Sequence, residues 1–288
     1  MIIDAHAHLW QKQNGIVNGK PVYDIGGGRS NFGGEIKQMM PPYMTDGVNS
    51  AERFLANMDY AGVSGAVITQ EYIDGNQDEY LLTCKSDRIK ICALYEEKPL
   101  GDISGFDGIK ICAGRLTDKN LLNHLEPFKV ANKNGKFISI DLADGDEQTA
   151  MMQEIINTFP DLKIAVGHFG MVTRDGWLEQ IKLAKNKNVF IESGGITWLF
   201  NSEFYPYPSA VKAINEAAEL VGFDKLIWGS DYPRTMTAVT YKMSLDFVEK
   251  TSEISDENKR LFLGENARKF YGFKDLTTPE KIKNMVED

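Results

Sequence analysis

The feature that most constrains the fold is an alternation of short apolar segments with segments of helical spacing. Apolar, β-branched strands that alternate with helices are typical of a parallel sheet covered on both faces. After the first ten residues, strands are expected over residues 65–70, 89–94, 107–113, 136–142, 162–166, 189–192 and 226–228. Helices are expected over residues 50–61, 78–85, 116–133, 147–159, 176–185, 209–221, 239–250, 256–263 and 265–270.

A further strand within residues 1–10 completes a set of eight. Eight strand–helix units in about 270 residues match a closed (β/α)8 barrel better than an open doubly wound sheet, which needs fewer strands. We therefore predict an α/β fold, a (β/α)8 barrel forming a single domain over residues 1–288, with the open sheet as the alternative. Residues 274–288 are expected to form a C-terminal extension.

Residues 11–48 interrupt the alternation, because they show little periodicity and are rich in glycine. No apolar strand precedes Gly26-Gly27-Gly28 and no Gly-Lys-Ser/Thr follows, so the segment is not expected to bind a nucleotide. A structureless loop this long inside a compact domain is usually disordered or functional. It is expected to be a lid over a site at the first strand or, equally, a surface insertion. The expected apolar contacts of the lid are Tyr23, Phe32, Met39, Met40 and Tyr43.

The first strand carries a His-x-His motif, His6 and His8. Because side chains alternate across a strand, both imidazoles point to the same face, about 7 Å apart along the strand. Two such imidazoles can bind one divalent cation. The alternative is a pair of hydrogen-bonded core histidines, but only four histidines occur in the chain and two of them have this spacing. The motif predicts a metal site if further ligands lie at the ends of later strands.

Polar residues occur near the ends of most later strands. In a (β/α)8 barrel the catalytic residues lie at the C-terminal ends of the strands. In strand order, these residues are His6 and His8, Glu71, Lys110, Asp141, His168, Glu192 and Asp231. Three of the four histidines are therefore expected on one rim of the barrel. The fourth, His124, lies in a predicted helix and is expected to be a surface or helix-packing residue.

Four short motifs in a specific order span nearly the whole chain: Asp4-x-His6-x-His8, Gly167-His168-Phe169-Gly170, Gly229-Ser230-Asp231-Tyr232-Pro233 and Gly264-x-Asn266-Ala267. They resemble the motifs of the amidohydrolase-related (amidohydrolase 2) barrel family. That group includes lactonases, other metal-dependent hydrolases and decarboxylases of the aminocarboxymuconate-semialdehyde type. The resemblance implies one divalent metal, usually zinc, held by His6, His8 and Asp231. It also implies that His168 acts as an acid or base, or polarises the substrate.

The chain departs from the family pattern at the end of the fifth strand, where many relatives supply a third metal-binding histidine. Here the sequence is Ile138-Ser139-Ile140-Asp141. There are three alternatives: Asp141 takes the place of that histidine, the metal is weakly held, or another residue completes the site, the candidates being Glu71, Glu192 and His168. Oxygen in place of nitrogen favours Mn²⁺ or Mg²⁺ over Zn²⁺. Some lactonases of this group are also thought to act without metal.

A zinc-bound water has a pKa near 7, and the ion polarises a carbonyl group. Asp231 beside the metal would accept the proton of that water and pass it to the leaving group. A neutral His168 near the carbonyl oxygen would donate a hydrogen bond as charge develops. The alternatives are a structural capping aspartate and a hydrogen-bonded rim histidine. The candidate substrate-binding residues are Lys110, Arg234, Trp198 and Tyr232, the first two as partners of a substrate carboxylate.

The function predicted from these residues is that of a metal-dependent hydrolase acting on a lactone, an ester or another small carboxylic acid derivative, and the type of bond rests on family analogy. The first alternative is a decarboxylase of a small aromatic or unsaturated acid, in which His168 protonates the carbon. The second is a non-catalytic barrel that binds a sugar acid or a partner.

The net charge of −9 and the pI near 5.1 argue against nucleic acid or an anionic membrane as a partner. The three cysteines, Cys84, Cys92 and Cys112, are far apart in apolar surroundings and are expected to be buried free thiols. No basic region followed by an apolar core opens the sequence, so a signal peptide is not expected, and no apolar run approaches about 18 residues. We expect a cytoplasmic protein with a small-molecule substrate, and a homodimer is a possible assembly.

Overall fold

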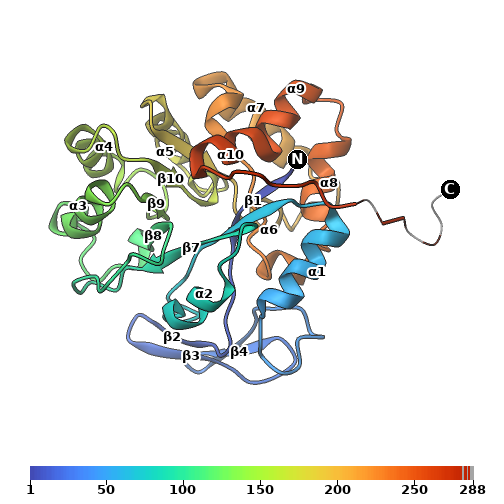
Figure 1. The fold of residues 1–288 in the computed structure, drawn as a ribbon, viewed down its shortest axis with the longest axis horizontal. Coiled ribbons are helices and arrows are strands. Elements are labelled where there is room, and N and C mark those ends of the chain that lie inside the picture. The colour runs from blue at the N-terminus through green and yellow to red at the C-terminus, as the bar shows by residue number, and fades with distance from the viewer. Residues whose placement is uncertain (281, 284, 286–288) are drawn as a thin grey trace.

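In the computed structural model, which describes residues 1–280, 282, 283 and 285, eight strands form a parallel barrel (Figure 1). Their spatial order follows the chain. They are β1 (Ile3–Ala7), β6 (Gly65–Ile68), β7 (Ile89–Leu94), β8 (Gly108–Ile111), β9 (Phe137–Ile140), β10 (Ile164–Val166), β11 (Val189–Glu192) and β12 (Leu226–Ile227). The predicted (β/α)8 barrel is confirmed.

The barrel closes between β1 and the residues that follow β12. The Ala5 N–H donates to the Trp228 carbonyl oxygen at 3.1 Å, and Ala7 pairs with Tyr232 in a parallel bridge. All five residues of β1 are buried, so its side chains fill the barrel interior or contact the surrounding helices. His6 and His8 therefore emerge at the rim where the first and last strands meet.

The helices cover the outside of the barrel, except the short α6 (Ile196–Leu199), which lies at the rim beside Asp231. They are α1 (Ala51–Ala61), α2 (Asp78–Cys84), α3 (Leu125–Lys133), α4 (Thr149–Thr158), α5 (Trp177–Lys182), α6 (Ile196–Leu199), α7 (Pro208–Val221), α8 (Met243–Lys250), α9 (Asp256–Arg260) and α10 (Asn266–Tyr271). The largest core cluster joins their apolar faces, including Phe54, Phe128 and Phe247, to the strands. The three cysteines are buried free thiols, as predicted.

Several helices differ from their predicted extents. The helix expected over residues 116–133 begins only at Leu125, because Pro127 lacks an N–H and is tolerated only in the first turn of a helix. The helix expected over residues 239–250 begins at Met243. A π-helical turn over Leu261–Glu265 connects α9 to α10, and the short helix α6 was not predicted.

Part of the segment over residues 11–48 forms a second sheet, so the expectation of a structureless loop was wrong. The sheet is antiparallel, in the order β2 (Asn14–Val17), β3 (Lys20–Asp24), β4 (Arg29–Phe32) and β5 (Glu35–Gln38). Asn18-Gly19 and Gly33-Gly34 turn the chain with positive φ angles, as two-residue hairpins require.

The two faces of this inserted sheet differ. Val17 and Val22 are buried on one face and pack against Ile73, which lies in the segment after β6. On the opposite face Ile16 and Ile36 are exposed, at 64% and 61% of their surface. The sheet therefore has one face that covers the barrel and one that meets solvent.

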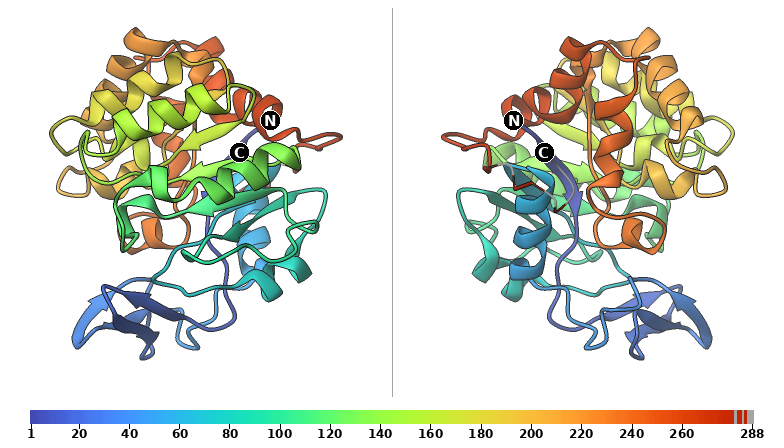
Figure 2. Two further views of the ribbon diagram at one scale, coloured as in Figure 1. Left: turned by 90° about the vertical axis from the view of Figure 1, so that its left-hand side faces the viewer. Right: turned by 90° about the vertical axis from the view of Figure 1, so that its right-hand side faces the viewer.

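The inserted sheet lies at one end of the barrel, and the N-terminus lies away from it, nearer the other end (Figures 1 and 2). Since β1 runs from the N-terminus toward the sheet, this is the end at which the strands finish. The N–H groups of Asn14 and Ile16 donate to the carbonyl oxygens of Asp74 and Tyr72, at 3.1 and 3.0 Å. The inserted sheet is thus attached to the rim that carries the candidate site.

The predicted C-terminal extension, residues 274–288, has no helix or strand among its described residues, and residues 281, 284 and 286–288 lie outside the description. Within the described part of the chain, no helix combines the length and the apolar character needed to cross a membrane.

Candidate metal centre and substrate cavity

His6 of β1 and His8, which follows this strand, converge on one point beside the barrel seam, with ring centroids 4.9 Å apart. The Nδ1 atom of His6 lies 2.6 Å from Glu192 Oε2, which orients the ring so that Nε2 points away from β11. This Nε2 atom is buried and has no hydrogen-bond partner among the residues that the structure describes. A buried imidazole nitrogen without a partner is costly unless something binds it.

Asp231 faces these histidines from the segment after β12. Its carboxylate oxygen Oδ1 lies 2.9 Å from His8 Nε2 and 3.9 Å from His6 Nε2, and Oδ2 accepts a hydrogen bond from Trp198 Nε1 at 2.6 Å. The backbone of Asp231 has a left-handed φ of 58°, and its N–H donates to His6 O at 2.8 Å. Strained backbone of this kind is concentrated at functional sites.

The protonation states of His6, His8 and Asp231 at neutral pH favour binding of a cation. Burial lowers the pKa of His6 to about 3 and that of His8 to about 4, with positive charge on Lys110 and Arg234 adding to the effect. Burial alone would raise the pKa of Asp231, but the hydrogen bond from His8 outweighs it and holds this pKa well below its usual range. At neutral pH the site therefore offers two neutral imidazoles and one carboxylate.

These residues fit a divalent metal. One donor atom from each of His6, His8 and Asp231 lies within 4.8 Å of the other two, and the unpartnered His6 Nε2 is among the candidate donors. Deprotonated imidazole and carboxylate are the forms that bind metal. Glu192 then has the role of the carboxylate that fixes the tautomer of a metal-binding histidine. In the metal-free protein burial raises the pKa of this carboxyl group to about 8, so it takes the carboxylate form at neutral pH only when a cation bound nearby favours ionisation.

Asp141, a predicted metal ligand, has a donor atom within 4.8 Å of one from His6 and one from His168, so it stays a candidate ligand, but it also pairs with a cation. The buried Lys110 Nζ lies 2.6 Å from Asp141 Oδ2, and His168 Nε2 lies 3.5 Å from the same oxygen. The ammonium group supplies a positive charge beside the end of β9. Lys110 was expected to bind the substrate, but its side chain is fully buried and lies outside the lining of the cavity described below.

His168 is held between two acceptors. Its Nδ1 donates to the Gly194 carbonyl oxygen at 2.8 Å, and its Nε2 faces Asp141. Burial alone would lower its pKa, but the negative charge of Asp141 outweighs burial and raises it to about 9. A neutral imidazole was expected here, whereas this surrounding favours the imidazolium form at neutral pH. Its backbone φ is also left-handed, at 52°.

A cavity of about 610 Å³ opens above these residues. Six predicted residues share its wall: His8, Glu71, Asp141, His168, Trp198 and Asp231. Arg234 also lines it, pairs with Asp74 Oδ2 at 2.6 Å and lies over the Trp10 ring, 5.8 Å from the centroid. From the inserted sheet, Gln38 and Met39 reach the cavity, so the end of β5 forms part of its mouth.

Two cations of the cavity, Arg115 and Lys119, were missed by the sequence analysis. Arg115 Nε lies 2.8 Å from Glu71 Oε1, so Glu71 pairs with a guanidinium group. Arg115 lies shortly after β8, in the sequence Ala113-Gly114-Arg115. Its position near the end of a barrel strand is the feature from which it could have been predicted as a site residue.

Other predicted residues lie elsewhere. Tyr232 was expected to contact the substrate, but its ring is buried against Phe54 and Tyr241 and does not line the cavity. His124 is a buried residue at the start of α3, and its Nδ1 lies 3.0 Å from Tyr95 Oη.

Of the five apolar residues expected in a lid, only Met39 lines the cavity. Met40 packs in a cluster with Trp10, Phe32 lies partly buried in the cluster of Val17 and Val22, and Tyr23 and Tyr43 are exposed.

Several solved structures share this fold at low sequence identity. They include a probable 2-pyrone-4,6-dicarboxylic acid hydrolase from Acinetobacter baumannii with citric acid bound, at 17% identity over 94% of this chain and 99% of that chain, with a TM-score of 0.68. An amidohydrolase from Burkholderia multivorans with bound zinc shares 14% identity over 95% and 100% of the two chains, with a TM-score of 0.68. A 5-carboxyvanillate decarboxylase from Novosphingobium aromaticivorans with bound manganese shares 17% identity over 78% and 82%, with a TM-score of 0.56.

Among curated proteins no match is found. The sequence profile of the family described as Amidohydrolase, in contrast, matches residues 104–273, which is more than half of the chain. This match includes the motifs around His168 and Asp231. The chain belongs to the amidohydrolase family.

Proposed function

We propose that this protein is a metal-dependent hydrolase that opens a small lactone or cleaves a small ester carrying a carboxylate group. The proposed metal is Zn²⁺, with Mn²⁺ or Mg²⁺ as alternatives, held by His6, His8 and Asp231. The observation that carries the proposal is the convergence of two neutral imidazoles and one ionised carboxylate beside a cavity lined by Arg234.

A divalent metal bound at such residues supplies a water molecule of lowered pKa and polarises a carbonyl group. Asp231, fixed by His8 and Trp198, is ionised and can accept a proton from the attacking water. His168 as an imidazolium can donate a hydrogen bond to the developing oxyanion or a proton to the leaving oxygen. Arg234 and Arg115 can pair with a carboxylate on the substrate or with the one formed by hydrolysis.

Decarboxylation is the second candidate, because an imidazolium at His168 can serve it as well as hydrolysis. An imidazolium facing the cavity is the acid that protonation of carbon requires after loss of carbon dioxide. A decarboxylase is also among the proteins of similar fold. Release of carbon dioxide from aromatic acids, measured beside proton release from lactones, separates the two reactions.

The first experiment is elemental analysis of protein purified without chelator or metal-affinity resin. We expect about one zinc or manganese per chain in the wild type and in His124→Ala, which alters a histidine outside the site, and loss of the metal in His6→Ala and Asp231→Asn. Folding of each variant is checked by circular dichroism. A wild type that binds no metal, even after zinc is added, would contradict the metal-dependent mechanism.

A further inference from the structure

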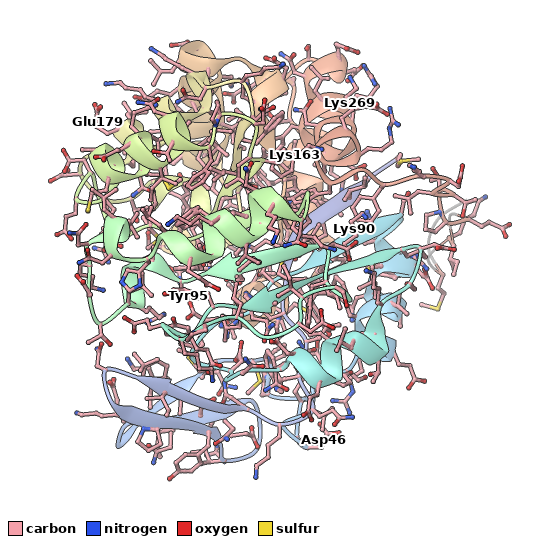
Figure 3. All side chains as sticks on the ribbon, turned by 60° about the vertical axis from the view of Figure 1, so that its left-hand side comes forward. Asp46, Lys90, Tyr95, Lys163, Glu179 and Lys269 are labelled. Carbon is pink, nitrogen blue, oxygen red and sulfur yellow. The ribbon has the colours of Figure 1, made fainter. Side chains whose placement is uncertain are left out.

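A second hollow of about 670 Å³ adjoins the cavity described above. We call it the outer groove. It lies between the β2–β3 hairpin of the inserted sheet and the segments that follow β6, β7 and β8. Figure 3 labels Tyr95, the residue after β7, at the edge of the barrel above the inserted sheet. Arg115 and Lys119 line both hollows, so the groove and the cavity meet at these two cations.

The charges along the outer groove balance. Glu96 and Glu97 line it together with Arg115 and Lys119, which gives two carboxylates and two cations. Glu97 is held in place because it accepts hydrogen bonds from the Thr117 N–H at 3.0 Å and from the Thr117 hydroxyl at 2.9 Å. Glu96 pairs with Lys98 at 2.9 Å. A lining without excess charge gives no preference for an anionic or a cationic ligand.

The neutral residues of the groove suit hydroxyl groups. Asn14 and Asn18 present side-chain amides, each of which can both donate and accept a hydrogen bond, as a hydroxyl group does. The amide of Asn76 also lines the groove, where it donates to Glu96 Oε2 at 2.9 Å and accepts from the Asp78 N–H at 2.9 Å. Ile16 and Tyr72 add an apolar side. Each hollow is within the range of about 300–1,000 Å³ that is usual for ligand sites.

We propose that the outer groove binds an uncharged, hydroxyl-bearing extension of the substrate whose carbonyl group lies in the inner cavity. The inference rests on the proposed lactone or ester hydrolysis. It adds that the substrate has two parts, an acyl end that lies beside Arg234 and a polar tail that extends beyond Arg115. Two sugar rings joined by one glycosidic bond have this form, with the lactone as one ring.

The test compares glucono-1,5-lactone, which has no tail, with cellobiono-1,5-lactone, which carries a second sugar ring. Enzymatic proton release is measured for both, after subtraction of spontaneous hydrolysis. The groove is filled by Ile16→Trp, which places an aromatic β-former on an exposed strand position. Ile36→Trp is the matched control, because Ile36 is equally exposed on the same face of the same sheet and lines neither hollow.

We expect kcat/KM of the wild type to be at least about tenfold higher for the disaccharide lactone, and Ile16→Trp to remove this preference while Ile36→Trp keeps it. Equal kcat/KM for the two lactones in the wild type, or the same loss for both lactones in Ile16→Trp, would overturn the proposal.

If neither lactone is hydrolysed, the proposed reaction fails for this substrate class, and the groove is judged separately by saturation-transfer NMR with cellobiose. Binding to the wild type and to Ile36→Trp, but not to Ile16→Trp, supports the groove. No binding to the wild type refutes it. Glu96→Ala provides a second groove variant if Ile16→Trp does not fold.

Discussion

At the scale of single residues, the contact between Glu192 and His6 decides how the metal site is oriented. Removing the carboxyl group in Glu192→Ala frees the His6 ring, whose Nδ1 lies 2.6 Å from Glu192 Oε2. We expect zinc affinity to fall by about 10- to 100-fold, as is usual for loss of such a partner. Glu192→Gln retains a carbonyl acceptor and is expected to keep most of the affinity. Competition with a chromophoric chelator measures the zinc affinity of each variant. Equal affinities in the wild type, Glu192→Ala and Glu192→Gln would show that Glu192 does not orient His6 for metal binding.

His168 makes stability depend on pH. Its pKa is about 9 in the folded protein against 6.5 for the ordinary side chain, because of Asp141. A raised pKa stabilises the fold fully below pH 6.5, and this contribution disappears as the pH rises through 9. In metal-free protein we expect the difference in unfolding free energy between wild type and His168→Asn to shrink by up to about 3 kcal/mol over that range. A difference that does not change with pH, measured by urea unfolding, would show that His168 titrates normally.

The sequence predicted where the candidate site residues lie, but it predicted only some of the side chains that they contact. His6, His8, His168 and Asp231 were predicted at one rim because each lies at a strand end, and the barrel brings strand ends together. The pairing of Lys110 with Asp141 depends on which way two side chains point across neighbouring strands, which strand position alone does not determine. Arg115 was missed because it lies just beyond a predicted strand.

At the scale of elements, the inserted sheet is the clearest failure of prediction. Its strands are only four or five residues long and contain glycine, proline and asparagine, so alternation of apolar residues is weak. The Asn18-Gly19 turn was the available signal, since this pair favours a two-residue hairpin. Burial of Val17 and Val22 against Ile73 then stabilises strands whose own propensity is low.

The hydrogen bonds of Gln13 are expected to hold this sheet on the barrel. Its buried side chain donates to Asp74 Oδ1 at 3.2 Å and accepts from the Ser30 hydroxyl at 2.6 Å. In Gln13→Ala both bonds are lost, at a cost of about 1–3 kcal/mol. Amides of residues 14–38 should therefore exchange about tenfold faster or more, while amides of the barrel strands keep their rates. Lys37→Ala, an exposed change in the same sheet, is the control. If amide exchange in Gln13→Ala rises equally in the inserted sheet and in the barrel strands, Gln13 does not hold the sheet on the barrel.

At the scale of the whole molecule, the number and order of barrel strands followed from the alternation, but the way the barrel closes did not. The seam joins the first strand to the last, more than two hundred residues along the chain, through the side chain of Asp4. This carboxyl group accepts hydrogen bonds from the Ser230 N–H at 2.9 Å, the Ser230 hydroxyl at 2.6 Å and the Tyr241 hydroxyl at 2.8 Å. Because Ser230 precedes Asp231, the seam also positions the candidate metal site.

Tyr241→Phe tests this closure, because it removes one hydrogen bond from Asp4 and keeps the buried ring. Burial raises the pKa of Asp4 to about 7, and the bonds from Ser230 and Tyr241 oppose that rise. The lost bond therefore matters more once Asp4 is ionised. We expect a loss of unfolding free energy of about 1 kcal/mol at pH 6 and about 2 kcal/mol at pH 8, since bonds to charged groups are stronger.

Tyr232→Phe is the matched control for Tyr241→Phe, because its ring packs against Tyr241 while its hydroxyl has no hydrogen bond in the described structure. Its change should stay within about 0.5 kcal/mol at both pH values. Equal losses in the two variants would assign the effect to ring packing and not to the bond with Asp4. A loss in Tyr241→Phe that is larger at pH 6 than at pH 8 would mean that the hydroxyl stabilises the protonated form of Asp4, and the seam would then tighten as the pH falls.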